Sequence, residues 1–293
     1  MPGCLPDLAA PYHFQQELRQ LWFEDARFAC SFGVWCGAGE CRESVVLQRM
    51  NQFEGRAEGP RRGRYLAPMN ARSIRLSELL LSINRSTNVD QGNLFRDQSD
   101  ADLDVFYAGD LSLLQRKCVS VIGARDVSEN GAARARRVAR GLVDAGIVVT
   151  SGLAKGVDIA AHAGALEEGG RTIAVIGTPL DKAYPVEHAE VQTEIYSHHL
   201  LVSQFLPGVR TFPSDFPKRN RLMAAVTDAS IIVEASDSSG TLHQAAECVR
   251  LGRWLFIMKA VAENRDLEWP SKFLKSPKVR VLSSVQDVVD VIG

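Results

Sequence analysis

The chain lacks long apolar runs and an excess of charge of either sign. No stretch of its 293 residues approaches the roughly eighteen apolar residues that a membrane-spanning helix needs. The first residues, MPGCLPDLAAPYHF, also lack the basic-then-apolar order of a secretory signal. These absences predict a globular cytoplasmic protein with no membrane partner. The formal net charge is −1, so any binding to nucleic acid would depend on a local cluster of cations.

Cysteine is also sparse. Six cysteines at irregular spacings do not form a disulfide framework, and they predict free thiols in a reducing compartment. Cys36 and Cys41 form a C-x4-C pair, but a structural zinc site usually needs a second close pair of ligands. Only Cys4, Cys30 and His13 are on offer for that purpose. We therefore predict no metal site.

Several catalytic motifs are missing as well. The sequence holds no G-x-G-x-x-G and no G-x-x-x-x-G-K-[ST], which removes the usual dinucleotide fingerprint and the usual ATPase loop. It holds no H-E-x-x-H or G-x-S-x-G either, so metalloprotease and serine-hydrolase interpretations lack their basis. These absences favour a binding protein over an enzyme.

The first third of the chain differs from the rest. Residues 1–68 show no sustained period of 3.6 or 2 and are interpreted as a poorly defined N-terminal extension, which leaves Met69 open as an alternative translation start. Residues 69–104 are predicted to be a short helical segment followed by a polar linker from Asn84 to Asp104. The helix is predicted from apolar residues at helical spacing, which are Ile74, Leu76, Leu79, Leu80 and Ile83.

From residue 105 to residue 293, short apolar runs alternate with amphipathic helical stretches. Strands that are apolar on both faces and separated by helices are typical of a parallel sheet covered on both sides. The expected strands are 118–123, 147–152, 172–177, 200–205, 230–235, 254–260 and 279–282, and the expected helices are 132–145, 159–168, 188–198, 222–225, 242–251 and 285–292. The sequence thus predicts an α/β fold: an extended Rossmann-like, doubly wound, mainly parallel sheet with an N-terminal extension.

In such sheets, ligands lie beyond the carboxyl ends of the strands, where free N–H groups at helix starts favour anions. The segments at these positions are 123–131, 151–158, 177–185, 205–221 and 234–241. They are rich in Gly, Ser, Thr and Pro and carry the cations Arg125, Lys155, Lys182, Arg210, Lys218, Arg219 and Arg221. Each segment taken alone is better explained as a tight turn bearing solvated cations. Their convergence on one edge favours a site for phosphate.

The segment FPKRNR, from Phe216 to Arg221, carries an aromatic ring and three cations just ahead of an expected helix. A flat ring can stack on a base while cations meet backbone phosphates, a combination that suits a single strand with exposed bases. The alternative is a solvated basic turn with Phe216 in the core.

Asp158 and His162 lie four residues apart near the start of a helix and share a face. They could form an acid/base pair. The more ordinary interpretation is that Asp158 accepts hydrogen bonds from N–H groups at the helix start while His162 packs or bonds locally.

Three long strings of the sequence resemble the DNA-processing protein A (DprA/Smf) family over about residues 105–293. They are VIGARDVSENG, VVTSGLAKGVDIAAHAGALEEGGRTIAVIGTPLDKAYPVEH and DFPKRNRLMAAVTDASIIVEASDSSGTLHQAA. The resemblance implies a protein that binds single-stranded DNA, forms a homodimer, loads a RecA-type recombinase in DNA uptake and recombination, and is not an enzyme. It also implies a DNA site at Arg125, Lys155, Gly156, Phe216, Lys218, Asn220, Arg221, Ser239 and Gly240. Ser151, Gly152, Arg219 and Thr241 of the same segments complete the candidate site, which has no catalytic member and no cofactor.

The sequence departs from this family at some positions. Pro179 stands where a glycine is expected, and its fixed φ and missing N–H would remove one anion contact. The strand 254–260 lacks the Pro-Gly expected after it, and no winged-helix segment follows the core.

Two other functions remain open on the sequence. One is a phosphoribohydrolase of the lysine-decarboxylase-like Rossmann group, which carries P-G-G-x-G-T-x-x-E. Here DSSGTLHQAAE keeps Gly240 and Thr241 but has His243 and Gln244 where the catalytic glutamate is expected. A hydrolase would lack its carboxylate. The other is a nucleotide-sensing module of a mobile element or defence system, which would share the same crevice.

Overall fold

The computed structural model describes residues 70–83, 85 and 102–292. Every described residue belongs to one compact unit, Arg62–Gly293. The predicted extension over residues 1–68 lies outside the described residues, as do residues 84 and 86–101 of the linker predicted from Asn84 to Asp104. Asp104, the last residue of that predicted linker, begins β2. No helix in the described part is long and apolar enough to cross a membrane.

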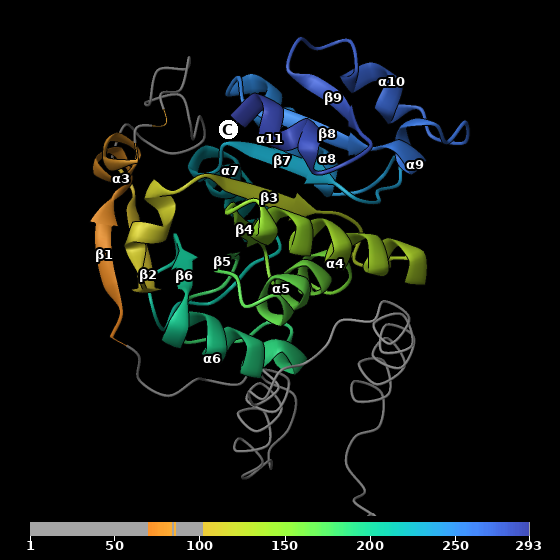
Figure 1. Cartoon of the computed structure of the whole chain (residues 1–293). Helices are drawn as coiled ribbons and strands as arrows, with labels where there is room; N and C mark the ends of the chain where they lie inside the picture. Colours follow the sequence, from red (N-terminus) through yellow and green to blue (C-terminus); the bar gives the residue numbers. More distant parts are fainter. Residues whose placement is uncertain (1–69, 84, 86–101, 293) are drawn as a thin grey trace, which may run out of the picture. The chain divides into compact units, whose positions relative to one another are not determined.

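Among the described residues, nine strands form one sheet in the order β1-β2-β6-β5-β4-β3-β7-β8-β9 (Figure 1). The strands from β3 to β9 pair in parallel, whereas β1 and β2 are antiparallel additions at one edge. Their bounds are β1 Arg72–Arg75, β2 Asp104–Gly109, β3 Cys118–Ile122, β4 Val148–Ser151, β5 Thr172–Ile176, β6 Leu200–Ser203, β7 Ala229–Ile232, β8 Trp254–Met258 and β9 Val279–Leu282. The predicted mainly parallel sheet is confirmed.

Helices cover both faces of this sheet (Figure 1). One face packs on α3 (Leu76–Ser82), α7 (Asp215–Val226), α8 (Thr241–Arg250), α9 (Lys259–Ala262) and α10 (Trp269–Phe273). The other packs on α4 (Glu129–Asp144), α5 (Val157–Glu167), α6 (Ala189–His198) and α11 (Gln286–Ile292). Two short 3-10 turns, η2 (Leu111–Gln115) and η3 (Val186–His188), complete the described elements. Because parallel strands bury both faces, they read as continuous apolar runs, and the doubly wound prediction is confirmed.

The N-terminal edge differs from its prediction. The helix expected from Ile74 begins only at Leu76, and Ile74 lies in β1, where it pairs with Val105 of β2. Helical spacing continues into the strand because Ile74 packs against the same core cluster that holds Leu76, Leu79 and Leu80 of α3. Strand β2 was not predicted, since its hydrogen bonds come from β6, far along the chain.

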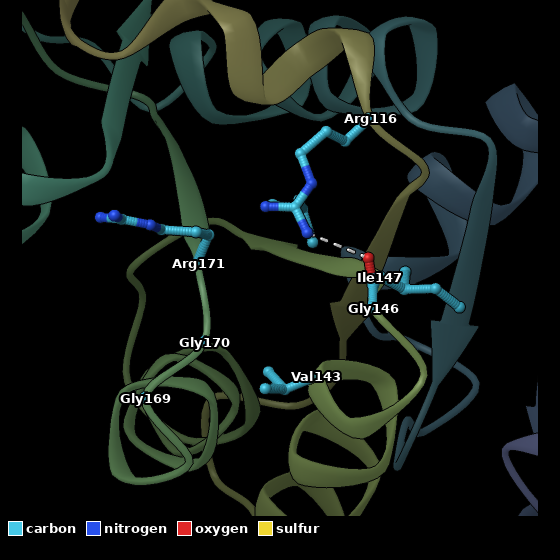
Figure 2. A pocket seen from close by; sticks show the side chains of 8 residues that line it. Arg116, Val143, Gly146, Ile147, Gly169, Gly170 and Arg171 are labelled. Carbon is cyan, nitrogen blue, oxygen red and sulfur yellow. Dashed lines mark hydrogen bonds between the residues drawn. The ribbon is translucent and has the colours of Figure 1, made fainter.

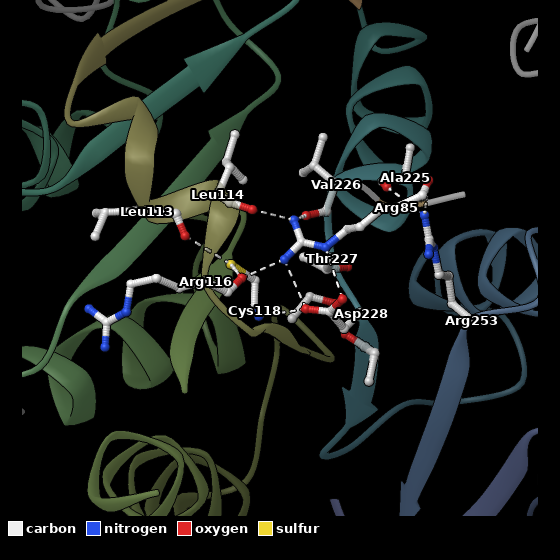
Figure 3. A network of polar contacts seen from close by, with 12 residues as sticks. Arg85, Leu113, Leu114, Arg116, Cys118, Ala225, Val226, Thr227, Asp228 and Arg253 are labelled. Atoms are coloured by element: carbon white, nitrogen blue, oxygen red, sulfur yellow. Dashed lines mark hydrogen bonds and ion pairs between the residues drawn. The ribbon is translucent and has the colours of Figure 1, made fainter. Parts of the chain in front are cut away.

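A buried arginine joins residues just after α3 to the centre of the sheet (Figure 3). The Arg85 guanidinium donates to both carboxylate oxygens of Asp228, at 2.9 and 2.8 Å, and to the carbonyl of Leu114 at 2.7 Å. It also donates to the carbonyls of Val226 and Arg116. The bidentate pair satisfies a buried charge, and it fixes residue 85 against the entries to β3 and β7.

Candidate functional site

The strand order places a topological switch point between β3 and β7. Strands β4, β5 and β6 lie on one side of β3, and β7, β8 and β9 lie on the other. The loops that leave the carboxyl ends of neighbouring strands flank this point, where sheets of this class bind ligands. They cover residues 123–128, 152–156, 177–185, 204–214 and 233–240. All five predicted segments therefore leave the sheet at one edge, the carboxyl edge.

The segment FPKRNR does not precede a helix, as predicted, but forms its first half. Helix α7 begins at Asp215, so Pro217 lies in its first turn, where its missing N–H has no helical partner to lose. As a consequence the side chains of Lys218 and Arg221, three residues apart, share one helix face, whereas Arg219 points elsewhere. Lys218 Nζ lies 3.5 Å from Asp215 Oδ1 within the same turn.

Phe216 lies at the centre of the carboxyl edge. Its ring is 5.2 Å from the guanidinium carbon of Arg125, which comes from the loop after β3. On the loop after β5, the Tyr184 ring centroid is 5.5 Å away, with the two planes tilted by 45°. A side chain at Gly177 would meet the Phe216 ring at 2.7 Å, so the ring lies directly on that backbone. Two loops distant in sequence, at residues 123–128 and 177–185, thus meet around one half-buried ring of helix α7.

Gly156 brings the loop after β4 against the same place. Its φ is +80°, and a Cβ there would lie 2.3 Å from the carbonyl oxygen of Ala124 and 2.6 Å from that of Arg125. Lys155, next to it, is exposed, and its Nζ lies 3.4 Å from Glu187 Oε1. The structure therefore places Arg125, Lys155, Gly156 and Phe216 together.

The close approach of the Gly156 backbone to the loop after β3 can be tested by substitution. Gly156→Ala should lower the free energy of unfolding by about 2–5 kcal/mol. The substitution adds the cost of a left-handed φ for alanine to the cost of a clash with a backbone carbonyl. Gly169→Ala is the matched control, since Gly169 has φ +69° but nothing within 4 Å of its added Cβ. It should lose only about 1–2 kcal/mol in urea unfolding. Equal losses in the two variants would show that the loops are not in contact at Gly156.

Arg219 differs from its prediction as a phosphate contact. It is only 5% exposed, and its guanidinium donates to the carbonyls of Gly152 and Val175, the latter at 2.8 Å. A Cβ on Gly152 would meet both Arg219 Nη1 and Asp158 Oδ2, so only glycine fits between them. Arg219 therefore holds the end of β4 instead of facing solvent. Its Nε donates to Asn220 Oδ1 at 2.8 Å, which also orients that predicted residue.

Ser151 is buried too, and its hydroxyl donates to the Val121 carbonyl at 2.7 Å. Its side chain is therefore used to tie β4 to β3. Ser151, Gly152 and Arg219 support the carboxyl edge from below, whereas Arg125, Lys155, Phe216 and Lys218 lie at its surface.

Asp158 and His162 are not paired with each other. Asp158 Oδ2 accepts from the Ala154 N–H at 3.4 Å, and His162 Nδ1 lies 2.8 Å from Thr172 Oγ1. Burial lowers the pKa of His162 to about 3, so the ring stays neutral near pH 7. Burial raises the pKa of Asp158, and the neighbouring Arg219 guanidinium opposes that shift. The ordinary interpretation of this pair, local bonding near a helix start, describes the observed contacts.

The loop after β7 joins the same edge. Thr241 Oγ1 donates to the Gly123 carbonyl at 3.0 Å, and the Ala124 N–H donates to the Glu234 carbonyl at 2.7 Å. Gly240 is exposed, and Ser239 is half-buried. Residues 239–241 therefore border the loop that carries Arg125.

An internal carboxylate occupies the start of α4. Glu234 Oε1 accepts from the Ser128 N–H at 2.9 Å, and Oε2 accepts from the Ser128 hydroxyl at 2.7 Å and from Arg134 Nη2 at 3.0 Å. A helix start at the switch point is where a nucleotide phosphate binds in many sheets of this class. Here a side chain of the protein supplies the anion.

A hollow lies at the opposite, amino edge of the sheet (Figure 2). This cavity of about 230 Å³ lies between the ends of α4 and α5, whose terminal carbonyls carry partial negative charge. Arg116 Nη2 donates to the Gly146 carbonyl at 3.2 Å, and Arg171 Nη1 donates to the His198 carbonyl at 2.5 Å. The two guanidinium groups thus offset the partial negative charge of backbone carbonyls.

Over residues 70–83, 85 and 102–292, no cluster of His, Cys, Asp or Glu could hold a metal ion.

The sequence interpretation did not single out Tyr184 or Glu234. Both lie in segments that it selected, since Tyr184 is in the loop after β5 and Glu234 follows β7. A signal for Tyr184 was available, because an aromatic residue in a polar loop is often functional. For Glu234 the only signal was its negative charge, which is unexpected in a segment whose other residues suit the binding of an anion.

The strand order and the loops gathered at its switch point define a doubly wound, Rossmann-like α/β protein. Comparison with known families makes this specific. The chain belongs to the DNA recombination-mediator protein A family, whose model matches residues 87–293. The resemblance drawn from the sequence is thereby confirmed, and the matched region begins somewhat earlier than residue 105.

Individual relatives agree with this membership. The chain is 42% identical over 157 residues to the DNA processing protein DprA of Streptococcus pneumoniae, covering 54% of this chain and 55% of that protein. It is 30% identical over 187 residues to Bacillus subtilis DprA, covering 64% and 63%. The matched regions thus span less than two thirds of either protein.

Two solved structures are similar as well. The X-ray structure of Streptococcus pneumoniae DprA superposes with a TM-score of 0.63 at 33% identity, covering 76% of this chain and 75% of that one. A Helicobacter pylori DprA structure gives a TM-score of 0.59 at 27% identity, covering 70% and 94%. That structure is described in terms of the unique single-stranded DNA binding mode of the Helicobacter protein.

Proposed function

We propose that this chain binds single-stranded DNA along the carboxyl edge of its sheet and acts as a DNA-binding protein, not an enzyme. The observation that carries the proposal is the half-buried Phe216 ring, with Arg125 at 5.2 Å and Tyr184 at 5.5 Å. A ring beside cations can stack on an unpaired base while the cations meet adjacent phosphates. A duplex would hide the base faces. The described binding of single-stranded DNA by the Helicobacter protein supports the same function here.

The remaining predicted residues take supporting or phosphate-binding roles in this proposal. Lys155, Lys218 and Arg221 would meet phosphates, and Gly156 would let a strand approach the backbone. Ser239, Gly240 and Thr241 would border the path of the strand beside Gly123. Arg219, Asn220, Ser151 and Gly152 would keep these groups in place without touching DNA.

Binding by fluorescence anisotropy tests this function. A labelled single strand should bind more tightly than a duplex or a mononucleotide, and its affinity should fall steeply with salt. Arg125→Ala with Lys218→Ala should weaken binding more than tenfold and flatten the slope of log K against log salt by about 1.4, from two lost phosphate contacts.

The matched control removes two cations from the amino edge. Lys117 directly precedes β3 and Lys278 directly precedes β9, and both are exposed. Lys117→Ala with Lys278→Ala has the same change in net charge and should leave affinity nearly unchanged. Equal weakening by both double variants would mean that general charge, not the carboxyl edge, binds DNA.

Membership of the family extends the proposal to partners. A homodimer and loading of a RecA-type recombinase onto the bound strand, in DNA uptake and recombination, are the roles that we infer. Light scattering of the purified chain and strand exchange by the recombinase on strands coated with the chain would test them separately.

A further inference from the structure

The loop between β6 and α7 exposes apolar side chains beside the proposed DNA site. Leu206 is 56% exposed, Val209 is 40% exposed and Phe212 is 51% exposed. Grouped apolar side chains at a surface usually mark a binding region. The occupant can be inferred from the position of this loop and from the charges beside it.

Phe212 precedes Phe216 by four residues, and a tight turn joins Phe212 to Asp215, the residue before Phe216. The Asp215 N–H donates to the Phe212 carbonyl at 3.0 Å, and the Phe212 N–H donates to Asp215 Oδ2 at 2.7 Å. A turn closed in this way brings its first and last Cα atoms within about 7 Å. Phe212 is therefore the first residue of a four-residue turn that ends at Asp215, the residue before Phe216.

A second contact joins this loop to the one that carries Tyr184. Lys182 Nζ donates to Thr211 Oγ1 at 3.3 Å, and the Ser203 hydroxyl, at the end of β6, donates to the Thr178 carbonyl at 2.7 Å. Tyr184 is 49% exposed and contacts the Phe216 ring. Hydrogen bonds thus connect the segments that carry the three rings, which are the loop with Tyr184, the loop with Phe212 and the start of α7 with Phe216.

A cation accompanies each of the three rings. Arg210 lies over the Phe212 ring at 5.5 Å, as Arg125 lies over the Phe216 ring at 5.2 Å. Lys182 lies two residues before Tyr184 in the chain. An apolar protein partner would favour an uninterrupted patch, whereas alternating rings and cations suit successive bases and phosphates.

We propose that Arg210 and Phe212 form a second stacking position for the single strand, adjacent to Phe216, and that Tyr184 supplies a third ring. The bound DNA would then place successive bases on separate rings, with Arg210 and Lys182 meeting the phosphates between them. This inference rests on the proposed function and defines the extent of its site.

The test compares single-stranded oligonucleotides of increasing length with strands of equal length that lack bases. Phe212→Ala should weaken binding of a long base-bearing strand by about five- to hundredfold, the range for one lost stacking contact. It should leave the affinity for a base-free strand nearly unchanged. Phe212→Trp should keep the wild-type affinity, because it keeps a stacking face. Tyr184→Ala should weaken the same base-bearing strand and also spare the base-free one.

Leu81→Ala is the control for an exposed apolar side chain elsewhere, since Leu81 is 73% exposed on α3. Equal weakening of base-bearing and base-free strands by Phe212→Ala would overturn the inference, because the ring would then act through the shape of the loop. Wild-type affinity in Phe212→Ala, with loss in the Arg125 and Lys218 double variant, would overturn it while leaving the proposed function standing. Failure of the wild-type chain to bind any single strand would overturn both.

Discussion

Replacing Arg85 with methionine should lower the free energy of unfolding by about 3–5 kcal/mol. Arg85 is 6% exposed, and its guanidinium pairs with both carboxylate oxygens of Asp228 (Figure 3). The variant would leave the Asp228 charge without its partner, along with the carbonyls of Leu114, Val226 and Arg116. Denaturant unfolding followed by circular dichroism measures the loss.

Arg75→Met is the matched control. Arg75 also pairs with an aspartate, Asp104, at 3.5 Å, but the two side chains are 56% and 51% exposed. An exposed pair of this kind contributes less than about 1 kcal/mol. Adding Asp228→Asn to Arg85→Met should cost less than the sum of the two single changes, since both remove the same pair. Similar losses in Arg85→Met and Arg75→Met would contradict the observed burial of the network.

Replacing Arg219 with methionine should also cost about 3–5 kcal/mol, and should reduce DNA binding although Arg219 does not face solvent. The change would leave the carbonyls of Gly152 and Val175 unpaired and would remove the guanidinium that opposes the rise in the pKa of Asp158. Arg210→Met, at an exposed arginine of the preceding loop, should change stability by less than about 0.5 kcal/mol.

The pH dependence of the Arg219→Met penalty separates its charge from its packing. Without Arg219, the pKa of Asp158 rises further because its largest opposing influence is lost, so the native state keeps a proton that the unfolded chain releases above about pH 4. The penalty should therefore be smallest at or below pH 4 and grow as the pH rises through the native pKa. Asp158→Asn in the same variant should remove this pH dependence. A penalty independent of pH would assign the loss to packing alone.

The sheet itself could be predicted because its signal is local. Runs such as CVSVI and TIAVI are buried along their whole length in β3 and β5, and a strand buried on both faces must be apolar throughout. The antiparallel strands β1 and β2 escaped prediction, since their burial is mixed and β2 pairs with β6, which is distant in the sequence. Arg85 escaped for a similar reason: its partner Asp228 is 143 residues away.

Within the candidate site the same division holds. Rossmann connectivity alone brings the loops after β3, β4, β5, β6 and β7 to one edge, and so the sequence could place Arg125, Lys155 and the FPKRNR segment together. It could not separate the members of that segment. Arg219 and Lys218 are neighbours in sequence, but a helix turns successive side chains by about 100°, which sends one into the core and leaves the other at the surface.

By itself, then, the sequence determined the doubly wound sheet, the family and the edge at which a ligand would bind, because these follow from patterns within short segments and from the order of those segments. The tertiary structure decided which cations remain at the surface, that Glu234 occupies the start of α4, and that Tyr184 lies beside Phe216. Those outcomes depend on contacts between residues far apart in the chain. Such contacts decide which side chains are buried and which distant charges pair.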